Sequence, residues 1–197
     1  MKIYAETERL VLRAFVEEDA ISFFEMDSDP LVHIYLGNNP ITTIEQAAST
    51  IANIRKQYVD FGIGRWAVIE KCSGALIGWS DLKFIDYKDN EHINFHDVGY
   101  RLMPKYWGKG YATESAKVSI KYGFEAMNLE EIIGTNHVDN LASRKALEKC
   151  GLKFVETFDW KGNQCNWFKI TKSEYEDSEI ALTEAGNIGR IWVGWET

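Results

Sequence analysis

The stretch LMPKYWGKGYATE, residues 102–114, decides the fold of this chain. It joins a strand-like segment, 94–102, to a segment with helical periodicity, 110–127, through a Gly-x-Gly turn. Glycines adopt backbone conformations that other residues avoid, and they let a ligand approach the backbone closely. A helix that begins near Gly110 presents unpaired N–H groups and the positive end of its dipole. Together these features predict an anion site suited to a pyrophosphate, the alternative being a tight turn that binds nothing.

Two familiar phosphate-binding patterns do not fit this turn. A Walker loop requires Ser or Thr after its Gly-Lys pair, and here Gly110 follows Lys109. The dinucleotide fingerprint requires a third glycine where Thr113 stands. A regulator that binds a nucleotide phosphate is therefore disfavoured.

The remaining chain alternates strand-like and helical segments, which predicts one mixed α/β domain of six to seven strands and about four helices. Residues 1–172 form this domain, and 173–197 form a C-terminal extension that is either an added strand or a segment for pairing with a second copy through Trp192 and Trp195. Strands are expected at 9–15, 65–71, 75–85, 94–102, 131–138, 152–160 and 165–171, and helices at 20–26, 43–58, 110–127 and 140–150.

The composition is that of an ordinary globular chain of 197 residues, with 45% hydrophobic and 26% charged residues. A formal net charge of -8 argues against nucleic acid as a partner and weakly favours a cationic or amine-bearing one. Three cysteines, placed far apart, predict neither a disulfide framework nor a structural zinc site. No apolar run approaches the ~18 residues of a membrane helix, and no targeting signal opens the chain, so a cytoplasmic protein without a membrane partner is expected.

Two long motifs carry a resemblance to a known family. Residues 97–115, DVGYRLMPKYWGKGYATES, resemble the acetyl-CoA-binding segment of the GNAT N-acetyltransferase superfamily, in particular its RimJ/RimL-like branch of ribosomal-protein acetyltransferases. Residues 136–157, NHVDNLASRKALEKCGLKFVET, resemble the Asn-x-x-Ser helix and following strand of that branch. The segments 6–15 and 75–82 also fit, so the resemblance covers residues 6–171 and implies the GNAT fold.

The resemblance implies that acetyl-CoA is the co-substrate and that a primary amine attacks its thioester directly. The acceptor is then a protein N-terminal α-amine, as in the RimJ/RimL-like branch, or a small-molecule amine. Backbone groups of Arg101 and Leu102 are expected to meet the pantetheine arm as an added strand would. Asn140 and Ser143, three apart on one helix face, are expected to contact CoA, and a helix N-cap is a compatible role for Asn140. The pyrophosphate is expected on Trp107, Gly108, Lys109, Gly110, Tyr111, Ala112 and Thr113.

Asp97 is the candidate general base because it stands at the acidic position of the family's Glu-x-Gly-Tyr strand pattern. Partial burial there would raise the pKa of its carboxyl group toward a useful range, whereas the alternative is a solvated or salt-bridged strand acid. Strand alternation points His96 to the other sheet face. His92 and His96 therefore do not predict a metal site, and no metal is expected. His33 either lines the substrate mouth or is a packed or surface histidine.

Ser143 is the candidate general acid for the CoA sulfur, directly or through water. Several related acetyltransferases carry a tyrosine where this chain has Leu147, so that candidate acid is missing. Lys105 and Leu152 also depart from the family pattern, at positions where it usually has Arg or Gln, and Phe. The second hypothesis is a CoA-binding sensor or regulatory module with degenerate catalysis, which an activity assay would distinguish from an enzyme.

Overall fold

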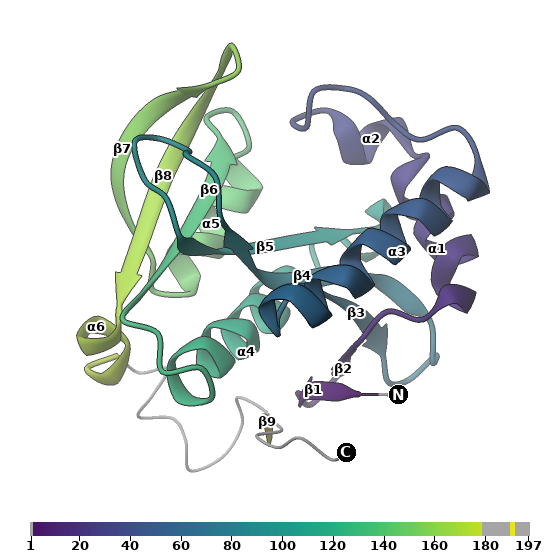
Figure 1. Ribbon diagram of the computed structural model, residues 1–197, viewed down its shortest axis with the longest axis horizontal. Helices are drawn as coiled ribbons and strands as arrows, with labels where there is room; N and C mark the ends of the chain where they lie inside the picture. Colours follow the sequence, from purple (N-terminus) through teal and green to yellow (C-terminus); the bar gives the residue numbers. More distant parts are fainter. Residues whose placement is uncertain (1, 179–189, 192–197) are drawn as a thin grey trace.

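A computed structural model describes residues 2–178 and 190–191 of the chain. In these residues the strands form one nine-stranded sheet in the order β7-β8-β6-β5-β4-β3-β2-β1-β9 (Figure 1). The strands are β1 (Ile3–Glu6), β2 (Leu10–Arg13), β3 (Arg65–Glu70), β4 (Leu76–Ile85), β5 (Phe95–Leu102), β6 (Glu131–His137), β7 (Lys153–Trp160), β8 (Asn163–Thr171) and β9 (Arg190–Ile191). The helices are η1 (Glu17–Asp19), α1 (Ala20–Asp27), α2 (Pro30–His33), α3 (Ile44–Phe61), η2 (Pro104–Tyr106), α4 (Tyr111–Glu125), α5 (Leu141–Lys149) and α6 (Lys172–Glu176).

Local sequence signals account for where several elements begin and end. Thr43 and Gln46 form a reciprocal capping box at the start of α3, and Gly62 ends that helix with a left-handed φ of 72°. The turn that contains Gly74, with φ 69°, joins β3 to β4 as a hairpin. The mixed α/β fold, this hairpin and the four helices expected from the sequence are all present.

The sheet contains one parallel pair of strands, β5 and β6. Each neighbouring pair of strands is antiparallel except β5 and β6, which run parallel and share the register pair Asp97–Ile133. Beyond that pair β5 and β6 diverge, as Figure 1 shows, while β5 stays paired with β4 from Phe95 to Leu102. One edge of the last half of β5 therefore faces an opening in the sheet.

Different helices cover the two sheet faces, so the sheet divides the core into two main clusters. On one face α4 and α5 pack against inward side chains of the strands. On the other face α1 and α3 pack against a second apolar cluster. Core residues of the first cluster include Leu10, Leu12, Trp66, Val68, Ile77, Leu82, Val98, Ile120 and Leu147, and those of the second include Phe15, Phe23, Met26, Ile51, Ile54, Ala67 and Trp79.

The sheet is longer than the six to seven strands expected. Residues 3–6 form an additional strand, β1, because Tyr4 and Ala5 are buried although the segment is short and carries little alternation. Arg190–Ile191 forms β9, which pairs antiparallel with β1 at Ala5 and Glu6. Trp192 and Trp195, the expected pairing residues, lie outside the described part of the chain.

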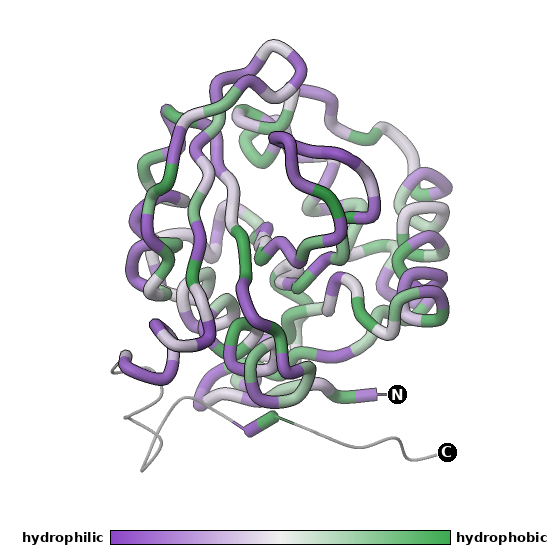
Figure 2. Tube along the Cα trace, turned by 60° about the vertical axis from the view of Figure 1, so that its left-hand side comes forward, coloured by the Kyte–Doolittle hydropathy of each residue, from purple (hydrophilic) through white to green (hydrophobic). Residues whose placement is uncertain are grey.

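Hydropathy changes frequently along the chain, with hydrophobic and hydrophilic residues interspersed in the helices (Figure 2). Accordingly, within residues 2–178 and 190–191 no helix has the length and apolar character of a membrane span. The same residues contain no group of three or more His, Cys, Asp or Glu side chains arranged to hold a metal ion.

Candidate active site

The glycine turn places the start of α4 directly after the end of β5. Gly108 and Gly110 have φ values of 72° and 83°, a region that side chains other than glycine rarely adopt. The N–H of Glu114 donates to the carbonyl of Gly110 at 3.0 Å, which is the first hydrogen bond of the helix. The N–H groups of residues 111–113 precede that bond and have no partner within the helix. The start of α4 thus has the geometry of an anion site.

The turn is fixed to the end of β5 by side chain and backbone. The indole Nε1 of Trp107 donates to the carbonyl of Leu102 at 2.7 Å, although 48% of Trp107 is exposed. The N–H of Met103 donates to the carbonyl of Ile77 on β4 at 3.0 Å. The carbonyl of Leu102, one of the groups expected to meet pantetheine, is therefore already engaged by Trp107.

The first residues of α5 lie across the opening in the sheet from β5. Asn140 caps this helix, because its Oδ1 accepts from the N–H of Ser143 at 3.0 Å. The hydroxyl of Tyr100, on β5, donates to the carbonyl of Ser143 at 2.9 Å and lies 3.1 Å from its Oγ. Burial raises the pKa of Tyr100, so this phenol keeps its proton. Tyr100 is the tyrosine of the Glu-x-Gly-Tyr strand pattern, but its contact with Ser143 is not predictable from the sequence, because the two residues are far apart in the chain.

Asp97 lies on β5 at the last residue that pairs with β6. Its Oδ1 atom is buried and has no hydrogen-bond partner among the described residues. Burial first, and then the negative charge of Asp81, raise the pKa of Asp97 well above its ordinary value. The carboxylate of Asp97 is thus half-buried, with an unpaired oxygen and an increased affinity for protons.

A cluster of charged side chains surrounds Trp79 on the same face as Asp97. Arg65 lies 3.5 Å from Asp81, and Arg101 donates to Asp27 on α1 at 2.7 Å. The guanidinium carbons of Arg65 and Arg101 lie 4.4 and 5.3 Å from the centre of the Trp79 ring. Burial raises the pKa of Asp81 to about 6. We call Asp27, Arg65, Trp79, Asp81 and Arg101 the charged cluster.

The sequence did not predict the charged cluster, because its members come from four separate elements. Counting Asp97 with it, the group contains two arginines and three aspartates, so its formal charge is one negative when all are ionised. Native proteins rarely bury polar atoms that lack a partner. Here Trp79 Nε1 and Arg101 Nε are buried without a hydrogen-bond partner in the described part of the chain, and Arg65 Nε makes no hydrogen bond beyond its 3.5 Å ion pair with Asp81. Beside Asp97, this face of the sheet is therefore polar, and several of its buried polar atoms lack hydrogen-bond partners.

Comparison with known proteins decides the family. Residues 9–153 match the family described as the acetyltransferase (GNAT) domain. The chain belongs to the GNAT acetyltransferase family. Over 148 residues this acetyltransferase is 31% identical to the uncharacterized N-acetyltransferase YoaA of Bacillus subtilis, an alignment that covers 75% of this chain and 81% of that protein.

Solved structures support the same assignment of the fold. A GNAT-family acetyltransferase from Bacillus anthracis has a TM-score of 0.72 and 26% identity, over 86% of this chain and 99% of that one. Spermidine N-acetyltransferase from Vibrio cholerae, solved in complex with CoA and spermine, has a TM-score of 0.68 over 85% of this chain and 98% of that one. At 20% identity, that second likeness shows the shared fold alone. This GNAT chain is an N-acetyltransferase.

The burial and contacts of three other residues considered in the sequence limit what each can do in this acetyltransferase. His33 is buried at 5% exposure, so it is a packed histidine and not an exposed one at the substrate mouth. The ring of His96 contacts Phe84, on the face opposite Asp97, as strand alternation predicted. Leu147, at the position of the missing tyrosine, is buried in the core under α5.

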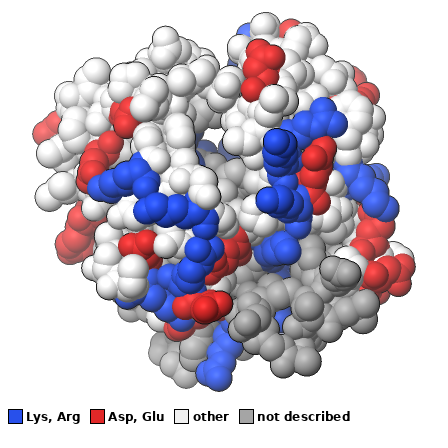
Figure 3. Space-filling view, turned by 180° about the vertical axis from the view of Figure 1, so that it is seen from behind, with Lys and Arg blue, Asp and Glu red and all other residues white. Residues whose placement is uncertain are grey.

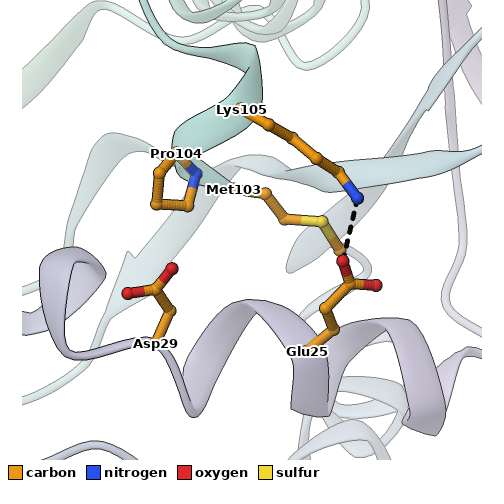
Figure 4. A pocket seen from close by; sticks show the side chains of 5 residues that line it. All are labelled: Glu25, Asp29, Met103, Pro104 and Lys105. Carbon is orange, nitrogen blue, oxygen red and sulfur yellow. Dashed lines mark hydrogen bonds and ion pairs between the residues drawn. The ribbon is translucent and has the colours of Figure 1, made fainter.

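A shallow pocket of about 260 Å³ lies beside Met103, Pro104 and Lys105, which precede the glycine turn (Figure 4). Glu25 and Asp29 point toward it from α1 and the residues that follow, and Met103 and Pro104 form the opposite side. Lys105, at the position where the family pattern usually has Arg or Gln, closes it with an ion pair to Glu25 at 2.8 Å. Asp97, Asn140 and Ser143 do not line this pocket, so it is separate from the candidate catalytic residues.

Proposed function

We propose that this N-acetyltransferase moves the acetyl group of acetyl-CoA to a primary amine by direct attack, with both substrates bound at once. The observation that carries the proposal is the opening between β5 and β6. It begins at Asp97, a half-buried carboxylate with a free oxygen, and it ends at the glycine turn before α4. A pantetheine arm laid along β5 would connect these two ends, with pyrophosphate at the turn and thioester near Asp97.

The CoA contacts follow from this placement. Trp107 to Thr113 would receive the pyrophosphate on backbone N–H groups, and Arg101 with Leu102 would receive the arm on the free edge of β5. Asn140 and Ser143 would contact the arm from α5 across the opening. Viewed from behind, lysine and arginine side chains gather on both sides of a central hollow, despite the net charge of -8 (Figure 3). Local positive charge of this kind suits a ligand that carries several phosphates.

Asp97 would accept the proton that the amine loses as the C–N bond forms. A carboxyl group with a raised pKa is a stronger base than an exposed aspartate, because a general base works best when its pKa approaches the working pH. Its free Oδ1 has the hydrogen-bonding capacity for this proton, directly or through one water. The charged cluster beside it keeps the neighbouring negative charge of Asp81 paired with Arg65.

Ser143 would donate the proton that the CoA thiolate takes up when the C–S bond breaks. Its Oγ lies 3.1 Å from the Tyr100 hydroxyl, which retains its own proton at neutral pH. Tyr100 therefore holds Ser143 at the opening through its carbonyl and its hydroxyl. This pair takes the place of the tyrosine that other family members carry where this chain has Leu147.

For the acceptor we propose an N-terminal α-amine, as in the RimJ/RimL-like branch. An α-amino group has a pKa of roughly 7.7–8.0, so about a tenth is neutral at pH 7, whereas a lysine-like amine near 10.4 is neutral in fewer than about one molecule in a thousand. A carboxylate base with its modest basicity is therefore better matched to an α-amine. A polyamine remains the second candidate, as the fold shared with spermidine N-acetyltransferase includes such an enzyme.

The test is a panel of acceptors incubated with acetyl-CoA and read by mass spectrometry of the products. Mass spectrometry is preferable to a thiol reagent because Cys72 is exposed and would contribute background. The panel pairs a short peptide that has a free N-terminus with its N-formyl form, each containing one lysine, and adds spermidine. We expect acetylation of the free peptide at its N-terminus and none of the formylated form.

Lysine or spermidine as the preferred acceptor would replace the α-amine proposal while preserving acetyl transfer. Tight binding of acetyl-CoA with no product from any amine would instead support the sensor hypothesis. Measuring acetyl-CoA binding on the same preparation by calorimetry separates these outcomes.

A further inference from the structure

Arg9 lies far from the glycine turn in sequence, yet its side chain contacts three residues in and after that turn. It sits between β1 and β2. Its Nη1 donates to the carbonyl of Lys109 at 3.0 Å, and its Nε donates to Glu114 at 2.7 Å. Its guanidinium carbon lies 4.4 Å from the centre of the Tyr111 ring. One planar side chain thus holds the residue before Gly110, the residue after it and the first turn of α4.

We propose that Arg9 is a positioning residue for the CoA pyrophosphate, an inference that rests on the proposed role of Trp107 to Thr113. The carbonyl of Lys109 and the N–H of Gly110 belong to one trans peptide group, so they point in opposite directions. Because Arg9 fixes the carbonyl of Lys109 on its own side, the N–H of Gly110 is directed away from Arg9. The guanidinium therefore sets the orientation of a donor in the phosphate turn without touching the phosphate.

Arg9 also removes an electrostatic conflict at the same place. Glu114 lies in the first turn of α4, where a bound pyrophosphate would meet its negative charge. The carboxylate of Glu114 is held by Arg9 through Nε, Nη2 and the backbone N–H, and by the hydroxyl of Thr7. Its charge is paired and its oxygens are directed toward the β1–β2 turn. Glu114 then serves to hold Arg9 in place.

Arg9 and the Tyr111 ring that it contacts are both hydrogen-bonded to residues in or next to β3. The hydroxyl of Tyr111 donates to Glu70 on β3 at 2.6 Å, and the N–H of Lys71 donates to the carbonyl of Arg9 at 2.9 Å. Tyr111 is buried at 7% exposure, so Arg9 packs on a ring that cannot easily move. A Cβ at Gly110 would come within 3.4 Å of Arg9 Nη2, which shows how closely the guanidinium approaches the turn.

The test compares two ligands that differ in whether they contain the pyrophosphate. Kd values for CoA are measured by calorimetry, and those for pantetheine by NMR titration at millimolar concentration. For Arg9→Ala we expect CoA affinity to fall by about tenfold or more and pantetheine affinity to stay within about twofold. The matched control is Arg55→Ala, because Arg55 is another partly exposed arginine paired with a glutamate, Glu17, and should leave both affinities unchanged.

Arg9→Lys separates orientation from charge and protects the test against misfolding. A lysine keeps an ion pair with Glu114, but it lacks the fixed fork of donors that also reaches Lys109. We expect it to fold as the wild type does, with CoA affinity at least fivefold weaker. Equal losses for both ligands in Arg9→Ala, no loss in either, or full CoA affinity in Arg9→Lys would overturn the proposal. If wild-type protein does not bind CoA more tightly than pantetheine, the phosphate-turn assignment itself fails, whatever Arg9 does.

Discussion

The two faces of the sheet bury different chemistry. Under α4 and α5 the side chains are mainly apolar. The polar exceptions include Ser80 and Ser119, whose hydroxyls lie 3.3 Å apart, and Trp66 Nε1, which is buried without a hydrogen-bond partner among the described residues. Under α1 and α3 the apolar cluster is accompanied by two arginines, three aspartates and several buried polar atoms without hydrogen-bond partners in the described residues. Among the described residues, the second face buries more charge and more polar atoms without a hydrogen-bond partner than the first.

The difference separates a face that stabilises the fold from a face that can bind and react. Apolar burial contributes stability in proportion to area, whereas buried charge costs stability unless it is paired and hydrogen-bonded. Departures from complete pairing are expected where a protein binds or transforms a ligand. Neighbouring residues on one strand point to opposite faces, so one contributes to stability and the next to binding or reaction. Substitutions can test this difference between the faces.

Asp97→Asn should have the largest effect, because it removes the proposed base from the polar face. An amide has the same size but accepts no proton, so turnover at pH 7 should fall by ~10²–10⁴-fold while acetyl-CoA affinity stays unchanged. In the wild type, turnover should rise with pH through the raised pKa of Asp97 and that of the acceptor amine. In the variant only the acceptor limb should remain, so the loss should shrink at high pH.

The exposed Asp86, in the loop after β4, provides a matched control. Asp86→Asn changes the same charge and should preserve turnover. Wild-type turnover in Asp97→Asn at pH 7 would assign the base to water or another residue and leave Asp97 as a structural strand acid.

Aspartates at Gly108 and Gly110 together should cause the second largest effect. Each adds negative charge where the pyrophosphate is expected, and each forces a side chain into a left-handed conformation that costs about 1–2 kcal/mol. We expect CoA affinity measured by calorimetry to fall by on the order of a hundredfold or more, with both sheet faces intact. Gly162→Asp is the control, since Gly162 also has positive φ and open space but lies in the β7–β8 turn. A loss of the same size in the control would show backbone strain alone.

The sequence predicted the glycine turn and its flanking elements because the whole signal lies in consecutive residues. Asp97 could be proposed for the same reason, since it stands on the strand that leads into this stretch, five residues before Leu102. The charged cluster could not, because Asp27, Arg65, Asp81 and Arg101 meet only after β3, β4 and β5 pair and α1 packs on them. The contact of Arg9 with Lys109 spans a hundred residues and was missed for the same reason.

Leu82→Ala should change stability and leave the site alone. Leu82 is fully buried on the α4 face, and its Cδ1 packs so closely that a Cβ at Gly123 would come within 2.8 Å. Large-to-small substitution at such sites costs about 2–5 kcal/mol. Urea unfolding should show this loss at every pH, with CoA affinity of the folded protein within about twofold. A larger change in CoA affinity would mean that the two faces are coupled.

Asp81→Asn, at the adjacent residue on the opposite face, should change the pH dependence of stability. Burial raises the pKa of Asp81 from 3.8 to about 6, so between these values the unfolded chain releases a proton that the folded chain keeps. Stability from this group is complete below pH 4 and is lost as pH rises through 6. The loss amounts to on the order of 2–3 kcal/mol at ~1.4 kcal/mol for each pKa unit.

The measurement is the difference in unfolding free energy between the wild type and Asp81→Asn at pH 4, 5, 6 and 7. Asparagine does not titrate, so the wild type should lose stability relative to the variant along this series. Taking differences cancels the carboxylates that do not interact with Asp81, and the cost of leaving Arg65 without its partner is an offset common to the series. Asp97 adds to the loss in the wild type, because the charge of Asp81 raises its pKa. A difference that does not change with pH would mean that Asp81 titrates alike in both states. If the wild type instead gains stability, then the charge of Arg65 outweighs burial, and the polar face is better satisfied than its unpaired atoms indicate.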